Sequence, residues 1–119
     1  MPVRVKNRSF YSGSISPASL NLETTVLSLS AETEIYFVGG YLDLTSLDIG
    51  DSILIQEYVE FDSTLKLYNS ETYTDAQSIV VIRVPTRKLK TGYKITLTQT
   101  TGTLRTIPYQ FDKFLTELA

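Results

Sequence analysis

The sequence predicts an all-β protein, a single-domain antiparallel β-sandwich of jelly-roll-like type with about seven or eight strands. Three observations support this fold class. Sixteen threonines and eight tyrosines, with many valines and isoleucines, fit the pleated surface of strands better than helices. Apolar residues recur with a period of two in several segments. Turn signals separate these segments by about 8 to 12 residues, without a βαβ rhythm.

Residues 92–111 contain the clearest pattern and predict a β-hairpin. Apolar and polar side chains alternate over 93–98, as in a half-buried strand. Gly102 then marks a turn, because glycine adopts positive φ without a steric penalty. The return strand covers 105–111 and contains Pro108, which cannot donate a ladder hydrogen bond. We therefore expect this strand to lie at a sheet edge, or to pair on one side only at the proline.

The remaining elements are less regular. Residues 1–8 predict an extended basic arm or a first edge strand, and residues 112–119 a short helical turn or a tail. The apolar run 78–84 predicts a central strand ended by Pro85. The paired glycines 39–40 indicate a bulge, a bend toward the other sheet or a close approach of another backbone. The other expected strands cover 24–30, 34–44, 52–61 and 64–68, the last two forming a second hairpin.

Composition excludes several classes of function. A chain of 119 residues predicts one domain, residues 1–119, which needs no metal or disulfide to fold. The absence of cysteine excludes thiolate catalysis and zinc–thiolate sites, and the absence of histidine excludes serine–histidine and cysteine–histidine hydrolysis. No segment approaches the roughly 20 apolar residues of a membrane span, and no signal-peptide pattern follows the basic start. We expect no targeting signal, no transmembrane segment and no membrane partner.

Charge is distributed unevenly along the chain, although the net charge is only −2. Nine acids and no base lie between Ser9 and Leu65, whereas bases cluster from Arg83 to Lys94. Such a division either favours oriented contact between copies or is neutralised within the fold. For contact between copies we expect three surfaces, formed by residues 3–8, 39–40 and 87–90.

Carboxylates are the groups best suited to acid–base chemistry in this chain. Glu57 and Glu60 lie three apart in one expected strand, so they face opposite ways and cannot flank one bond. Glu57 is a buried acid with a raised pKa, or it lies at the sheet margin or pairs with a base such as Arg83 or Arg105. No mechanism follows from either arrangement. We therefore expect a non-enzymatic protein without catalytic residues.

Other constellations are equally nonspecific. Asp43, Asp48 and Asp51 could supply oxygen ligands to calcium, but their spacing is not that of an EF-hand loop. The basic segment 83–94 could follow a phosphate backbone, yet the net negative charge argues against nucleic acid. We expect neither a metal nor a cofactor. Tyrosines on the less apolar faces could stack on sugars, as in a carbohydrate-binding module, or could serve as ordinary strand and interface residues: Tyr36, Tyr58, Tyr68 and Tyr73.

Four phrases taken together carry a resemblance to a known group of proteins. They are GGYLDL, LDIGD, YNSETYTDAQ and GYKITLTQTTGTLRTIPY, within residues 24–109. In their order the chain resembles small all-β structural proteins of viruses and phages, mostly uncharacterised virion-associated open reading frames. The resemblance implies a minor capsid, decoration or tail-associated protein of the virion that assembles with itself or with other virion proteins. The alternative is a β-sandwich module that binds a carbohydrate or a cell-surface receptor.

Overall fold

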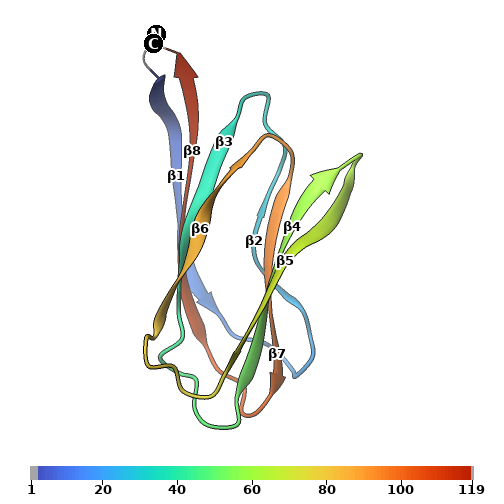
Figure 1. Cartoon of the computed structure of the whole chain (residues 1–119), viewed down its shortest axis with the longest axis vertical. Coiled ribbons are helices and arrows are strands. Elements are labelled where there is room, and N and C mark those ends of the chain that lie inside the picture. The colour runs from blue at the N-terminus through green and yellow to red at the C-terminus, as the bar shows by residue number, and fades with distance from the viewer. Residues whose placement is uncertain (1–2, 119) are drawn as a thin grey trace.

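The computed structural model describes the backbone of residues 3–118 and the side chains of residues 8–115. Within this part the chain is all-β, and no helix is present that could cross a membrane. Two four-stranded antiparallel sheets pack face to face (Figure 1), sheet A in the order β1-β8-β3-β6 and sheet B in the order β2-β7-β4-β5. The prediction of an antiparallel β-sandwich is confirmed, and its jelly-roll-like topology stays a prediction. The strands are β1 (Val3–Ile15), β2 (Thr24–Leu29), β3 (Tyr36–Asp43), β4 (Ser52–Phe61), β5 (Thr64–Thr74), β6 (Val81–Leu89), β7 (Tyr93–Thr101) and β8 (Ile107–Leu118).

The core lies between the two sheets. Alternating side chains of both inner faces meet there, and the largest fully buried ones are Tyr36, Tyr93 and Phe111. Each aromatic side chain of this size removes about 150–250 Å² from water, so these residues dominate the driving force for packing the sheets. The hydroxyl of Tyr36 donates to the carbonyl of Thr91 at 2.5 Å, so its polar end is satisfied despite burial.

The hairpin predicted for residues 92–111 is wrong. β7 pairs with β2 and β4 in sheet B, whereas β8 pairs with β1 and β3 in sheet A. Residues 102–106 cross from one sheet to the other, because both strands turn their apolar faces toward the same core. The second predicted hairpin is confirmed, since β4 pairs with β5. Pro108 pairs with Ser14 of β1 but lies beyond the pairing with β3, so the expectation of one-sided pairing at this proline is also confirmed.

The central strand predicted for residues 78–84 is also wrong. β6 begins at Val81, forms an edge of sheet A, and leaves Ile79 and Val81 exposed at 77% and 50%. The strand continues through Pro85, because an edge strand needs hydrogen bonds on one side only. An apolar run of this length does not distinguish an edge strand with an apolar outer face from a central one.

The glycine pair in β3 allows the neighbouring strands β6 and β8 to lie close to β3. Pro85 and Thr86 of β6 together oppose Gly39, which makes a bulge there. A Cβ on Gly39 would lie 2.9 Å from the Cα of Thr86, and one on Gly40 would lie 2.0 Å from the carbonyl oxygen of Gln110. The expectations of a bulge and of a close backbone approach are therefore confirmed. A change of sheet at this point is not observed, since β3 remains in sheet A.

Both ends of the described chain belong to sheet A. β1 begins at Val3 and pairs with β8, which runs to Leu118 (Figure 1). Residues 112–118 are therefore strand, where the sequence predicted a helical turn or a tail, because Phe111, Lys113 and Leu115 continue the inward alternation. The expected basic arm corresponds to the start of β1; the side chains of residues 1–7 lie outside the described residues, and Arg8 pairs with Asp112 of β8. Contacts of this arm with another copy remain a prediction.

Gly40→Ala tests the close approach of β3 and β8. The added methyl group would overlap backbone atoms of β8, which β1 and β3 hold on both sides, so we expect a loss of about 3 kcal/mol in the free energy of unfolding. Urea denaturation measures it. The matched control is Gly13→Ala, whose methyl group would meet only the ring and hydroxyl of Tyr109, at 3.0 Å and beyond. An equal loss in both variants would contradict the account.

Candidate functional site

Glu57 is a buried carboxylate at the junction of the two sheets. It lies on β4 with only 2% of its surface exposed. Arg87 of β6 donates to both carboxylate oxygens, at 3.2 and 2.8 Å. Asn69 of β5 and the hydroxyl of Tyr93 on β7 donate the remaining hydrogen bonds, at 2.8 and 2.5 Å. The carboxylate thus accepts four hydrogen bonds, and the ion pair joins sheet B to sheet A.

The electrostatics of this cluster are those of a structural ion pair. Burial alone would raise the pKa of Glu57, but the hydrogen bonds from Arg87, Asn69 and Tyr93 outweigh it and hold the pKa below its usual value of 4.5. Burial and the neighbouring carboxylate raise the pKa of Tyr93. The expectation of a raised pKa for Glu57 is therefore wrong. The expectation of a basic partner is correct in kind, but the partner is Arg87 rather than Arg83 or Arg105.

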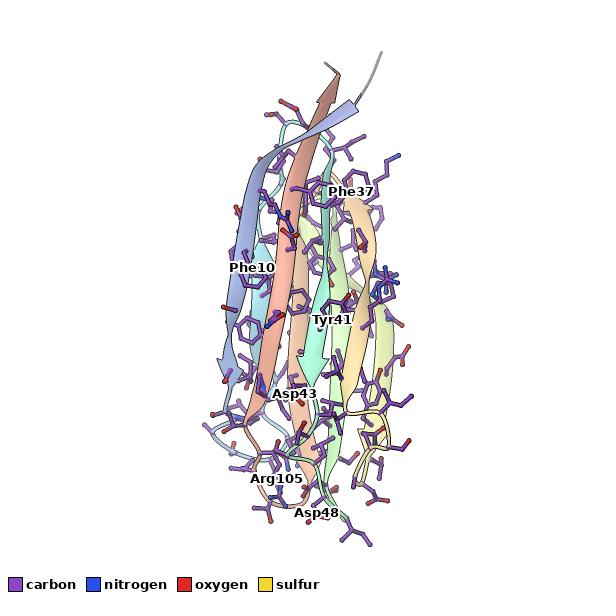
Figure 2. All side chains as sticks on the ribbon, turned by 90° about the vertical axis from the view of Figure 1, so that its left-hand side faces the viewer. Phe10, Phe37, Tyr41, Asp43, Asp48 and Arg105 are labelled. Atoms are coloured by element: carbon purple, nitrogen blue, oxygen red, sulfur yellow. The ribbon has the colours of Figure 1, made fainter. Side chains whose placement is uncertain are left out.

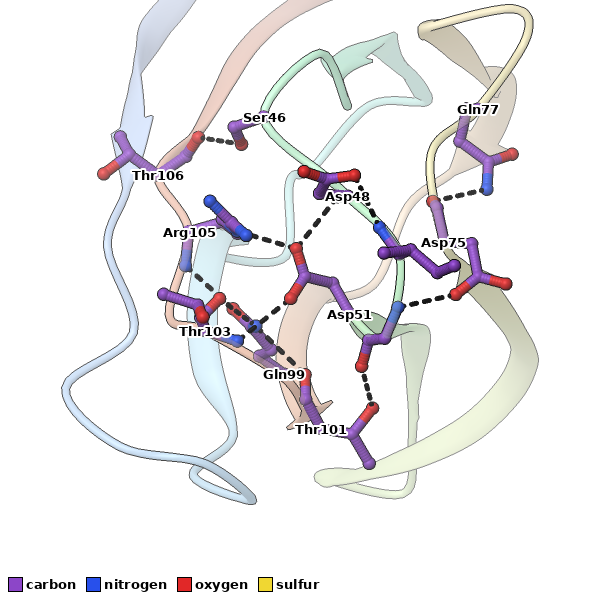
Figure 3. Close-up of polar contacts among 12 residues, drawn as sticks. Ser46, Asp48, Asp51, Asp75, Gln77, Gln99, Thr101, Thr103, Arg105 and Thr106 are labelled. Carbon is purple, nitrogen blue, oxygen red and sulfur yellow. Dashed lines mark hydrogen bonds and ion pairs between the residues drawn. The ribbon is translucent and has the colours of Figure 1, made fainter.

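Asp51 organises a second buried cluster, at the end of the sandwich where three loops meet (Figure 3). It is 1% exposed and accepts hydrogen bonds from Nε of Arg105 at 2.6 Å and from the amides of Thr103 and Asp48, both at 2.9 Å. The side chain of Gln99 bonds the same β7–β8 loop, accepting from the Arg105 amide and donating to the carbonyls of Thr101 and Thr103. This cluster holds the loop that crosses between the sheets.

The carboxylates of the Asp51 cluster and its neighbours bond groups of the protein itself. Burial raises the pKa of Asp51, but the amide of Asp48 and the Arg105 guanidinium outweigh it, so the pKa lies below 3.8. Asp48 accepts from the amide of Ile49, and Asp43 accepts from Thr45. Among residues with described side chains, no group of three or more acidic residues converges on one point. The three aspartates weighed as calcium ligands bond the protein itself.

The outer face of sheet A carries an aromatic surface. Figure 2 shows this face, with Phe10 on β1 and Phe37 and Tyr41 on β3. Phe10 is 62% exposed and Tyr41 is 51% exposed. Phe37 stacks on Phe114 of β8 at a centroid distance of 5.2 Å. We call Phe10, Phe37, Tyr41 and Phe114 the aromatic face; contiguous exposed apolar surface of this kind typically marks an interaction site.

Two hollows interrupt this face. The first has a volume of about 310 Å³ and lies over the backbone of Gly39 and Gly40; we call it the glycine hollow. The second has a volume of about 390 Å³ and lies between Tyr41 and Pro108. The full lining of the glycine hollow is Arg8, Phe10, Gly39, Gly40, Tyr41, Arg83, Val84, Thr86, Gln110, Phe111, Asp112 and Phe114.

Charge in the glycine hollow is incompletely balanced. Arg8 forms a two-bonded ion pair with Asp112, at 3.1 and 2.5 Å. Arg83 is exposed and makes no hydrogen bond or ion pair with residues 8–115, whose side chains the structure describes. The lining therefore contains two arginines and one aspartate, a net charge of +1.

The sequence identified this site only in part. The glycines 39–40 were predicted as a contact surface, and they form the floor of the hollow. Phe114 was assigned to a helical turn or tail, although its alternation with Phe111, Lys113 and Leu115 would have placed it on the outer face of a strand. Pairing across β1, β8, β3 and β6 decides that these aromatic residues share one face.

Other predicted site residues are dispersed. Tyr36 lies in the core, whereas Tyr58, Tyr68 and Tyr73 lie on β4 and β5 of sheet B, so the four tyrosines form no single platform. The basic segment is divided as well. Arg87 points inward to Glu57, while Lys94 lies on sheet B above the ring of Tyr58, at 5.9 Å. Residues 87–90 are thus not a free contact surface as a whole.

Residues 3–118 thus form an eight-stranded antiparallel sandwich with an exposed aromatic face. It matches no family model and shows no match among curated proteins. Its fold is similar to that of VP2 of infectious bursal disease virus in the subviral particle, with a TM-score of 0.52, 12% identity, and coverage of 95% of this chain and 33% of that chain. The Gt strain of the same virus gives a TM-score of 0.50, 12% identity, and coverage of 97% and 32%. The chain therefore spans about a third of those chains, and the resemblance to structural proteins of viruses is confirmed at the level of fold.

Arg87→Met tests the ion pair between the sheets. Removing the guanidinium leaves a buried charge on Glu57 without its cation, so we expect the free energy of unfolding to fall by about 3 kcal/mol. Urea denaturation measures the change, and Glu57→Gln combined with Arg87→Met should recover most of it. Lys88→Met, an exposed change on the same strand, should stay within about 0.5 kcal/mol. Arg87→Met behaving like Lys88→Met would contradict the role of the pair.

Stability should decline in acid because the pKa values of Glu57 and Asp51 are lowered in the folded state. A depressed carboxyl pKa contributes stability above the unfolded value, about 4, and loses it as pH falls through the folded value. We expect the urea midpoint to drop between about pH 5 and pH 3, and the slope to be shallower in Glu57→Gln. A midpoint independent of pH over this range would contradict the depressed pKa values.

Proposed function

We propose that the chain is a non-enzymatic structural module of a virus particle that acts through self-association. The aromatic face of sheet A carries this proposal, because Phe10 and Tyr41 lie more than half exposed beside hollows rather than in the core. Aromatic residues and arginine are enriched where proteins contact one another. The likeness in fold to a protein of a subviral particle supports the viral part of the proposal.

The use of the buried polar groups supports a structural role over a catalytic one. Glu57 and Asp51, the two buried carboxylates among residues 8–115, accept several hydrogen bonds each and have lowered pKa values. A general base or acid near neutral pH needs the opposite shift. Within the described side chains, every buried polar atom has a hydrogen-bond partner. These groups stabilise a rigid sandwich, which is what a repeating component of a particle requires.

Within a virion, a minor capsid, decoration or tail-associated position fits a small module with one open face. The partner is a second copy or another virion protein. The alternative, a carbohydrate- or receptor-binding module, draws on the same aromatic residues, since flat rings can stack on a sugar. This alternative requires a monomer that binds glycan. The mass of the protein in solution therefore distinguishes the two functions.

Light scattering over a wide range of concentration tests self-association. We expect the mass to rise to a multiple of the monomer mass with concentration. The double variant Phe10→Ser with Tyr41→Ser should raise the apparent dissociation constant about tenfold or more, because aromatic anchors dominate interface energies. Its matched control is Ile49→Ser with Ile79→Ser, which removes exposed apolar side chains of the connecting loops.

Two outcomes would contradict the proposal. The first is a strict monomer at every concentration that also does not add to preformed particles, because this result contradicts self-association. Equal weakening by both double variants would show that general hydrophobicity, not the aromatic face, drives association. Circular dichroism confirms in each case that the variants retain the β-sheet spectrum.

A further inference from the structure

The tip of the β4–β5 hairpin is a second unusual surface. Phe61 ends β4, Thr64 begins β5, and Asp62 and Ser63 between them have φ values of +50° and +64°. Two consecutive left-handed residues make the tight turn that matches the twist of a two-stranded ribbon, so the tip has a defined shape. Figure 1 shows it projecting clear of the other loops.

This tip presents an aromatic ring beside a free carboxylate. Phe61 is 58% exposed. Asp62 is exposed, and its side chain forms no hydrogen bond or ion pair with any residue whose side chain is described. The hairpin belongs to sheet B, whereas the glycine hollow opens on the outer face of sheet A. A molecule therefore cannot insert its own tip into its own hollow.

The glycine hollow complements this tip in size, polarity and charge. Its volume of about 310 Å³ is at the lower end of the range of binding pockets and can accommodate one aromatic side chain. Phe10, Tyr41 and Phe114 offer rings at its rim. Its net charge of +1 comes from the unpaired Arg83, and guanidinium binds carboxylate through two parallel hydrogen bonds.

We propose that the hairpin tip of one copy inserts into the glycine hollow of a second copy, with Phe61 against the aromatic rim and Asp62 paired with Arg83. The inference rests on the proposed self-association and names its two surfaces. Because tip and hollow are different surfaces, the contact is heterologous, and each bound copy keeps one free tip or hollow. Repetition closes a ring or extends a filament.

A single contact of this kind is small. Stable interfaces bury about 1,200–2,000 Å², and a hairpin tip in a hollow buries less. Assembly should therefore depend steeply on concentration. It should also weaken with salt, because the Asp62–Arg83 pair lies at the rim of an open hollow where ions screen it.

Charge reversal tests the pairing. Asp62→Arg and Arg83→Asp should each raise the apparent dissociation constant about tenfold or more, because each places like charges at the contact. The double variant Asp62→Arg with Arg83→Asp should restore association. Equimolar mixing of the two single variants should also restore it, because each reversed surface then meets its complement on the other variant. Sedimentation velocity measures all five samples, including the wild type.

Controls separate the contact from net charge and from folding. Glu71→Arg and Lys88→Asp make the same charge changes elsewhere on β5 and β6, and should associate like the wild type. Arginine is less suited than aspartate to the φ of +50° at position 62. Asparagine tolerates this left-handed conformation as aspartate does, so Asp62→Asn serves as a second tip variant. It should weaken association without changing the thermal midpoint.

The outcomes distinguish this inference from the proposed function. Wild-type assembly with no effect of either reversal, or weakening without rescue in the double variant and the mixture, overturns the tip-in-hollow contact and leaves self-association intact. A wild type that never associates overturns both. Glucuronic acid, a carboxylate-bearing sugar, probes the other occupant. If it shifts the amide signals of Gly39 and Gly40 in the wild type but not in Arg83→Asp, while tip variants associate normally, the hollow binds a sugar and the contact is overturned.

Discussion

The ion pair between Glu57 and Arg87 is the constraint on which the assembly of the two sheets depends. Apolar side chains drive sheets together without specifying their alignment, since burial is non-directional. A buried carboxylate, in contrast, must meet its cation, because leaving it unpaired costs several kcal/mol. Glu57 belongs to sheet B and Arg87 to sheet A, so this requirement sets β4 against β6. Tyr93 and Asn69 complete the cluster from the neighbouring strands.

The uneven charge along the chain is neutralised in part by ion pairs within the fold. The acids of the first half find bases of the second half: Asp51 bonds Arg105, Glu57 bonds Arg87, and Glu32 bonds Lys113 at 2.8 Å. Each pair joins segments far apart in sequence. Lys113, although largely buried, also lies 5.0 Å from the ring of Tyr36. The separation of acids and bases along the sequence therefore favours ion pairs between distant segments. Charges without a partner among the described side chains, such as Arg83 and Asp62, are available to other molecules.

The two glycines of β3 are required by strand packing and also lie beneath the glycine hollow. Gly40 has no side chain because the β8 backbone passes too close, and Gly39 has none because the β6 bulge lies against it. Both absences are required by strand packing. The glycine hollow lies over the same two residues on the outer face, beside aromatic side chains.

The sequence by itself determined the fold class, the hairpin of β4 and β5, and the bulge and close backbone approach at Gly39–Gly40. These follow from local alternation, turn residues and missing side chains. The sequence also offered a basic partner as one of the alternatives for Glu57. Only the tertiary structure decided that the partner is Arg87, that β7 and β8 lie in different sheets, and that β6 is an edge. The physical reason is that alternation records which side of a strand faces apolar surroundings. It contains no information on which strand lies beside it, and that choice depends on packing and ion pairs between residues distant in sequence.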